Sequence, residues 1–220
     1  MVAALYVETN GVYYGLTNVD PWDEARDARL YAGPYPVVAH PPCARWGRYW
    51  YGGPMLHKQG RRLNLGDDGG CFAAAFEAVR EWGGVIEHPE ASYAWPAFGI
   101  PKPPSAGGWV GCLDGGWTCC VEQGHYGHRA RKATWLYVYG TVPSPLIWGK
   151  SDAGVRVDQG FHSKEERRRV QRLGTLRATG SDRMPRRECK ATPTIFRDVL
   201  ISIAEACNDQ ETRTPHDLEA

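Results

Sequence analysis

The chain has 220 residues, of which 42% are hydrophobic and 11% aromatic, and its formal net charge at pH 7 is +1. This length fits one domain, and the composition favours a packed core over a disordered chain. The charge does not by itself indicate a dedicated nucleic-acid-binding domain, because such domains are often strongly basic.

Seven cysteines, an odd number, together with the lack of an amino-terminal signal segment favour a reducing compartment and free thiols. No apolar run approaches the ~20 residues that span a bilayer. We therefore expect a soluble, cytoplasmic protein with no membrane partner.

The first forty residues predict a hairpin, a helix and a strand. Asn10-Gly11 is a strong turn signal, which places residues 4–7 against residues 12–15. Asp20 and Pro21 resemble the start of a helix over residues 21–31 that ends near Gly33. The apolar run 36–39 then predicts a strand.

The next segment predicts a parallel crossover. Apolar residues recur at helical spacing over residues 70–82, and a short strand over 84–87 follows. Strands 36–39 and 84–87 are therefore expected to be parallel, with both carboxyl ends at one edge of the sheet. The Pro/Gly-rich segment 93–118 predicts a loop or a small insertion, and 135–139 predicts a third strand.

The carboxyl-terminal third predicts helices and a tail. A basic helix is expected over residues 164–173, and a last helix opens at Pro193 with Thr192 as its cap. The stripe that this helix buries consists of Phe196, Val199, Leu200, Ile203 and Cys207. We expect one α/β domain over residues 1–207 and a disordered polar tail over 208–220.

The tripeptide Pro41-Pro42-Cys43 follows strand 36–39 directly. A proline pair ends the strand and leaves the thiol on a loop at the strand's carboxyl end, where open α/β sheets place their chemistry. Such a thiol can act as a nucleophile. The alternative is a buried structural cysteine.

Three segments in this order resemble the target-base half of DNA cytosine-5 methyltransferases, and also phage-encoded proteins described as DNA methylases. The resemblance covers residues 36–140 and, more weakly, 191–207. It consists of the Pro-Pro-Cys loop, a strand that ends in a Glu-led triplet at Glu87, and a Tyr-Gly segment with the spaced pair Arg129 and Arg131. His128 stands where the family has a Gln, and no glycine loop for S-adenosylmethionine precedes the thiol.

The resemblance implies a fold and a reaction. The fold is a truncated, Rossmann-like, mostly parallel sheet with flanking helices. Cys43 is the implied nucleophile toward carbon 6 of a cytosine, and Glu87, Arg129 and Arg131 complete the catalytic set. The implied substrate-binding residues are Pro41, Pro42, Trp46, His88, Gln123, His128 and Lys132.

The reaction that the resemblance implies is a one-carbon transfer to DNA, with the cytosine flipped out or single-stranded. The implied donor is S-adenosylmethionine, and a folate is the alternative because the glycine loop is absent. We expect Arg45, Arg129 or His88 to lower the pKa of Cys43, and burial to keep Glu87 protonated.

Other interpretations remain open from the sequence. Trp46 could instead anchor its loop, and Glu87 could instead form an ion pair with an arginine. Zinc is a second possibility, with ligands among Cys112, Cys119, Cys120, His125 and His128. A hard-cation nuclease site would use Asp67, Asp68, Glu87 and Glu122. The remaining alternative is a non-catalytic protein, either a DNA-binding protein or an inhibitor, that keeps the base pocket.

Overall fold

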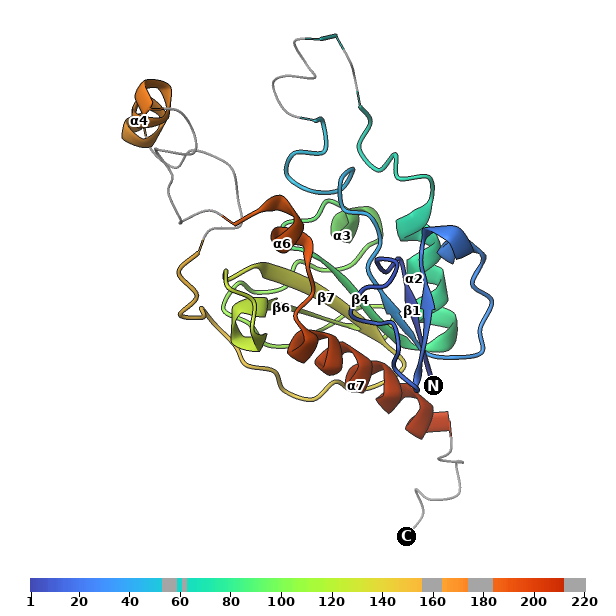
Figure 1. Ribbon diagram of the computed structural model, residues 1–220. Helices are drawn as coiled ribbons and strands as arrows, with labels where there is room; N and C mark the ends of the chain where they lie inside the picture. Colours follow the sequence, from blue (N-terminus) through green and yellow to red (C-terminus); the bar gives the residue numbers. More distant parts are fainter. Residues whose placement is uncertain (53–58, 61–62, 156–163, 174–183, 212–220) are drawn as a thin grey trace.

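The computed structural model describes residues 1–52, 59–60, 63–155, 164–173 and 184–211 (Figure 1). Within these residues the strands form one seven-stranded sheet in the order β2-β1-β3-β4-β7-β6-β5. The parallel half contains β2 (Val19–Trp22), β1 (Val2–Leu5), β3 (Val37–Ala39) and β4 (Gly84–Pro89). The antiparallel half contains β7 (Ala133–Tyr139), β6 (Trp117–Glu122) and β5 (Val110–Gly111). The α/β class is confirmed, but the sheet is mixed rather than mostly parallel.

Helices cover both faces of the sheet (Figure 1). Helix α2 (Cys71–Trp82) packs on the face that carries Ile86, and helix α7 (Thr194–Glu211) packs on the face that carries Val85. Strands β1 and β3 are buried along their whole length. Central parallel strands covered on both sides need continuous apolar runs, and these two segments provide them.

The predicted crossover is confirmed. Strands 36–39 and 84–87 correspond to β3 and β4, which pair in parallel, and helix 70–82 corresponds to α2 between them. Gly84 has a φ of +129°, and a Cβ at this position would overlap the Val37 carbonyl oxygen. Only glycine allows the two strands to approach so closely. The carboxyl ends of β3 and β4 therefore lie at one edge.

The predicted amino-terminal hairpin is wrong. β1 pairs in parallel with β2 on one side and with β3 on the other. Residues 12–15 belong to a turn-rich loop, in which the Tyr14 N–H donates to the Gly11 carbonyl at 3.1 Å. The local Asn10-Gly11 signal is outweighed because a fully buried apolar strand gains most from partners on both sides.

The predicted helix over 21–31 is also wrong. Its first residues lie in β2, and two short 3-10 turns follow, η1 (Glu24–Arg26) and η2 (Ala28–Leu30). Pro21 is tolerated in β2 because this strand is at the edge of the sheet. Asp23 does cap a helical turn, since its carboxylate accepts from the Ala25 N–H at 3.1 Å.

Strand 135–139 is confirmed as part of β7, which runs antiparallel to β4. The segment 93–118 is mainly irregular but contains the short helix α3 (Ala94–Ala97) and β5. β6 was not predicted, because its sequence follows a Pro/Gly-rich stretch and shows no clear alternation. It leads directly into the 3-10 helix η3 (Gln123–Tyr126).

The carboxyl-terminal helices are confirmed. α4 (Lys164–Leu173) and α7 match the predicted segments, and α6 (Arg186–Lys190) is additional. The buried stripe of α7 faces the sheet and includes Phe196 and Leu200, both fully buried. Because α7 continues to Glu211, the start of the predicted tail at residue 208 is wrong. Residues 212–220 lie outside the described residues.

Candidate active site

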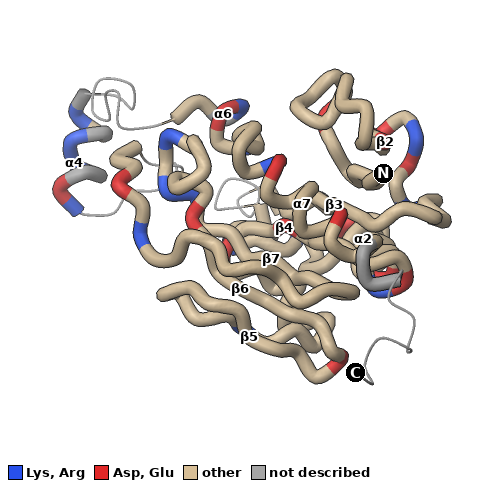
Figure 2. Tube along the Cα trace, turned by 90° about the horizontal axis from the view of Figure 1, so that it is seen from below, with Lys and Arg blue, Asp and Glu red and all other residues tan. Residues whose placement is uncertain are grey.

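The candidate site lies at the edge of the sheet where β3 and β4 end. β3 leads into His40-Pro41-Pro42-Cys43, and β4 carries Glu87. Ala39, the last residue of β3, pairs with Ile86, so the residues that follow β3 lie beside Glu87, while β4 continues to Pro89. Helix α6 lies next to the segment 129–132, to which it is bonded. Lys and Arg residues around α6 are blue in Figure 2.

The Glu87 carboxylate is fixed by two donors from different elements. His40 Nδ1 lies 2.9 Å from Oε2, and Gln123 Nε2 lies 3.1 Å from Oε1. Gln123 is fully buried and donates a second bond to Thr134 Oγ1 at 2.9 Å. The Glu87 side chain is 12% exposed. It is therefore held tightly and still reaches the surface of the site.

Glu87 is ionised in this environment. Burial alone would raise its pKa, but the hydrogen bond from His40 and the positive charges of His40 and Lys132 lower it to about 2. The expectation of a carboxyl kept protonated by burial is therefore wrong. The overlooked factor was His40, which directly precedes the Pro-Pro-Cys loop.

His40 is itself held by a buried tyrosine. Tyr13 is 3% exposed, and its hydroxyl lies 2.8 Å from His40 Nε2. Sequence reasoning assigned a role to neither residue. For His40, adjacency to the candidate nucleophile was an available signal. Tyr13 is 27 residues away on the loop after β1, and nothing in the sequence indicates this contact.

Cys43 is exposed at the start of a tight turn. Its carbonyl accepts bonds from the N–H groups of Trp46 at 3.1 Å and Gly47 at 2.9 Å. The pKa of the thiol is raised, first because the surrounding protein displaces water and second because Glu87 is negative nearby. The expected lowering of this pKa is therefore wrong.

The positive charges that act on the Cys43 thiol are Lys190 and Lys132. Lys132 donates from Nζ to the backbone carbonyls of Ala191 at 2.8 Å and Lys190 at 3.3 Å. Burial lowers the pKa of Lys132, while the negative charges of Glu87 and Cys43 act in the opposite direction. The backbone of Lys132 has a φ of +43°, which is unusual outside glycine. Lys132, a predicted substrate-binding residue, is thus close enough for its charge to act on both reactive groups.

The two predicted arginines are placed differently. Arg129 is paired with Glu188 of α6 at 2.7 Å, and its side chain is 61% exposed. Arg131 is exposed as well. Neither is among the described charges that act on Cys43 or Glu87. The catalytic role implied for them does not follow from this geometry.

Two predicted base contacts are core residues. His88 points to the opposite face from Glu87 because consecutive strand residues alternate. It is 1% exposed, bonded to Ser92 Oγ at 2.7 Å, and burial lowers its pKa to about 4. Trp46 is buried against Phe72 and donates to Asp68 Oδ2 at 2.7 Å. Both therefore anchor the structure and are unavailable for stacking on a base. Of the two prolines, one is buried and the other, Pro42, is exposed.

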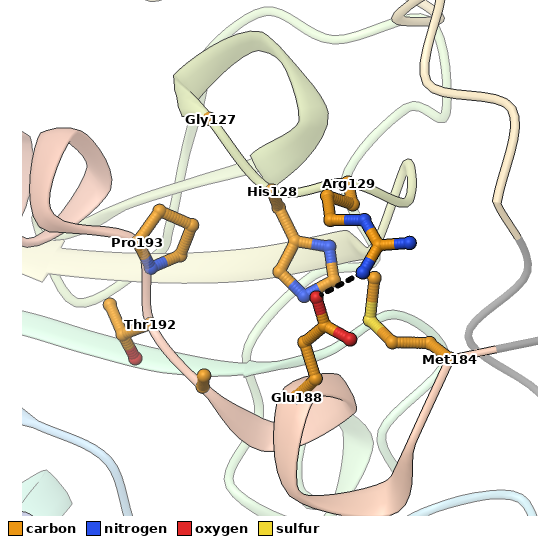
Figure 3. Close-up of a pocket in the computed structure, with 8 residues that line it drawn as sticks. Gly127, His128, Arg129, Met184, Glu188, Thr192 and Pro193 are labelled. Carbon is orange, nitrogen blue, oxygen red and sulfur yellow. Dashed lines mark hydrogen bonds and ion pairs between the residues drawn. The ribbon is translucent and has the colours of Figure 1, made fainter.

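His128 lines a separate cavity of about 190 Å³, shown in Figure 3. It is 6% exposed, and its Nδ1 lies 2.9 Å from the Ala130 carbonyl. The cavity is lined by Gly127, His128, Arg129, Met184, Glu188, Ala191, Thr192 and Pro193.

The metal alternatives do not fit the geometry. Cys119 and Cys120 point into opposite cores, and His125 Nε2 lies 3.1 Å from the Gly149 carbonyl. The nuclease set is also dispersed: Asp68 caps α2 through the Phe72 N–H at 2.9 Å, and Glu122 accepts from Ser151. Among the described residues, no three His, Cys, Asp or Glu side chains form a group that could hold a metal ion.

Comparison of the chain with family models, with curated proteins and with solved structures finds no match in any of the three. No helix in the described part of the chain is long and apolar enough to cross a membrane.

Proposed function

We propose that this protein modifies cytosine in DNA at carbon 5, through a covalent adduct between Cys43 Sγ and carbon 6 of the ring. The observation that carries this proposal is the shared sheet edge, where an exposed thiol lies within electrostatic reach of a fixed, buried carboxylate, Glu87. The finer assignment of the sheet to a Rossmann-like methyltransferase fold is part of the same proposal. Motif resemblance alone identifies cytosine as the base.

The reaction would use the two groups in sequence. The Cys43 thiolate adds to carbon 6, and the electron pair of the double bond moves into the ring, which gains a proton at nitrogen 3. Carbon 5 then attacks the one-carbon group of the donor, and the rest of the donor departs with the bonding electron pair. Water takes the proton from carbon 5, which expels the thiolate and restores the double bond. The proton on nitrogen 3 returns to the thiolate, which regenerates the neutral base and the thiol. Glu87 faces nitrogen 3 in this arrangement, and the charge of Lys132 stabilises the thiolate.

The resting protonation states are consistent with this sequence. The thiol has a raised pKa and keeps its proton, whereas Glu87 is ionised. Forming the adduct from this state requires that one proton leave sulfur and that one reach nitrogen 3. The proton that leaves the Cys43 thiol can reach nitrogen 3 by way of Glu87, so no external acid is needed.

The loop after Cys43 offers surface groups that suit DNA. Tyr49 and Tyr51 are 59% and 40% exposed, and Arg48 is exposed between Cys43 and these rings. Exposed aromatic side chains stack on bases, and arginine pairs with phosphates. We propose that this loop, rather than Trp46, contacts the nucleotides around the target base.

The residues that follow β1 do not fit S-adenosylmethionine in the manner that the resemblance implies. Gly11 packs against the Glu8 carbonyl of its own turn and forms no open cradle. Asp23, the acid after β2, already accepts bonds from Thr9 and Tyr14 at 2.7 and 2.6 Å. We therefore assign no step to this cofactor. A folate is the alternative one-carbon donor in the proposal.

The test uses DNA that contains 5-azacytosine, whose nitrogen 5 takes up a proton after the thiolate adds, so that no donor is needed. Wild type and Cys112→Ser, which removes a thiol outside the site, should form an adduct that survives denaturation. Cys43→Ser should form none. Equal adduct yield in Cys43→Ser would refute the nucleophile. Tight binding without an adduct in the wild type would instead support a non-catalytic DNA-binding protein.

A further inference from the structure

Tyr13, His40 and Glu87 form a continuous hydrogen-bonded chain across two loops and a strand. The distances are 2.8 Å from the Tyr13 hydroxyl to His40 Nε2 and 2.9 Å from His40 Nδ1 to Glu87 Oε2. His40 is 12% exposed in its side chain, like Glu87. The chain is therefore mostly shielded from water, where hydrogen bonds are strong and geometrically demanding.

Chemistry fixes the direction of the bond to Glu87. The ionised carboxylate only accepts, so His40 Nδ1 must carry a proton. Burial raises the pKa of the Tyr13 phenol well above 10, so this group keeps its proton. Its hydroxyl donates to Nε2 of a neutral imidazole, and its oxygen accepts from Nε2 of a charged one. In both forms Tyr13 holds the ring with Nδ1 directed at Glu87.

We propose that His40, oriented by Tyr13, is the positioning residue that holds the Glu87 carboxylate, through its hydrogen bond, in the orientation in which it meets the pyrimidine ring. The inference depends on the proposed function. His40 lies three residues before Cys43 on the same short segment. One stretch of backbone therefore sets the position of the nucleophile and that of the partner of Glu87.

Other groups act on the same carboxylate and must be considered in any pH experiment. Gln123 holds the second oxygen from η3, at 3.1 Å. Among the described residues, the other charged or titratable groups that interact with Glu87 are Lys132, His88, Tyr13 and Cys43. Within the described parts of the chain, only His40 both bonds to Glu87 and directly precedes the Pro41-Pro42-Cys43 loop. This distinguishes its role from that of the charges that act on Glu87 from a distance.

The test compares His40→Leu, His40→Asn and Tyr13→Phe with the wild type. Asn offers an N–H near the position of Nδ1, whereas Leu offers none. His125→Leu, which alters a histidine outside the site, is the matched control. We expect His40→Leu to slow formation of the 5-azacytosine adduct by about 10- to 100-fold, because small misplacements of a reacting group have effects of this size. His40→Asn should recover most of the rate, and DNA affinity should change little in all variants.

A second readout does not need activity. The carboxyl carbon of Glu87, followed by nuclear magnetic resonance, should show no titration between about pH 4 and pH 8 in the wild type and a titration in that range in His40→Leu. Its absence in that variant would overturn the inference, as would equal adduct rates in His40→Leu and the wild type. If the wild type forms no adduct, the proposed function fails, while the titration still shows whether His40 sets the ionisation of Glu87.

Discussion

Replacement of Glu87 by Gln should lower the free energy of unfolding at pH 7 by about 3 kcal/mol. The carboxyl pKa falls from an ordinary 4.5 to about 2 in the folded protein, and each unit corresponds to about 1.4 kcal/mol. Because the folded value is the lower one, the stabilisation is complete above about pH 4.5 and is lost as the pH falls toward 2. The amide does not titrate, so the variant should lack this dependence.

Urea unfolding of the wild type and Glu87→Gln at several pH values from about 7 to 3 measures this effect, with the exposed Glu81→Gln as the matched control. The gap between wild type and Glu87→Gln should be largest at pH 7 and should shrink below about pH 4.5, whereas Glu81→Gln should follow the wild type throughout. A carboxyl kept protonated by burial predicts the opposite sign: the variant would be the more stable protein at pH 7. That result would refute the ionised assignment.

Three further predictions concern the Cys43 thiol, His88 and Gly84. The raised pKa of the Cys43 thiol predicts slow alkylation by iodoacetamide. Glu87→Gln should speed alkylation at about pH 8, because it removes the negative charge that is the second cause of the raised pKa. An unchanged rate would contradict the electrostatic interaction between Glu87 and the thiol. Burial lowers the pKa of His88 to about 4, so the wild type should lose up to about 3 kcal/mol as the pH falls from 6.5 to 4, and His88→Phe should abolish this loss. Gly84→Ala should reduce stability by more than about 2 kcal/mol in thermal unfolding, because its Cβ would overlap the Val37 carbonyl; a near-neutral effect would mean that β3 and β4 are less closely aligned.

The parallel crossover was predictable because local and global signals agree there. The helical spacing of Phe72 and Phe76, the glycine pair after α2 and the apolar run before Pro41 all indicate the same arrangement. That arrangement brings Cys43 and Glu87 to one edge without any knowledge of the remaining sheet. The central part of the candidate site thus follows from about fifty residues.

The residues that surround Cys43 and Glu87 could not be predicted in the same way. The alternation of β4 sends Glu87 and His88 to opposite faces, but the sequence does not state which face is the site, and both residues are chemically suitable. Likewise, the charge of Lys132 acts on the thiol, whereas Arg129 pairs with Glu188 and Arg131 is exposed. A motif fixes spacing along the chain, but it does not determine which of several basic side chains turns toward the site.

The position of Tyr13 links these observations to the sheet topology. β1 lies between β2 and β3, so the chain leaves β1 toward one side and returns on the other. Loops diverge at such a switch point, and open α/β sheets generally bind ligands in the resulting crevice. In this protein a side chain of the chain itself lies between the two loops: Tyr13, on the loop after β1, is buried and bonded to His40, on the loop after β3. The protein therefore uses its switch point to hold Glu87 through His40. A one-carbon donor for the proposed reaction would have to approach Cys43 from the exposed side of the loop.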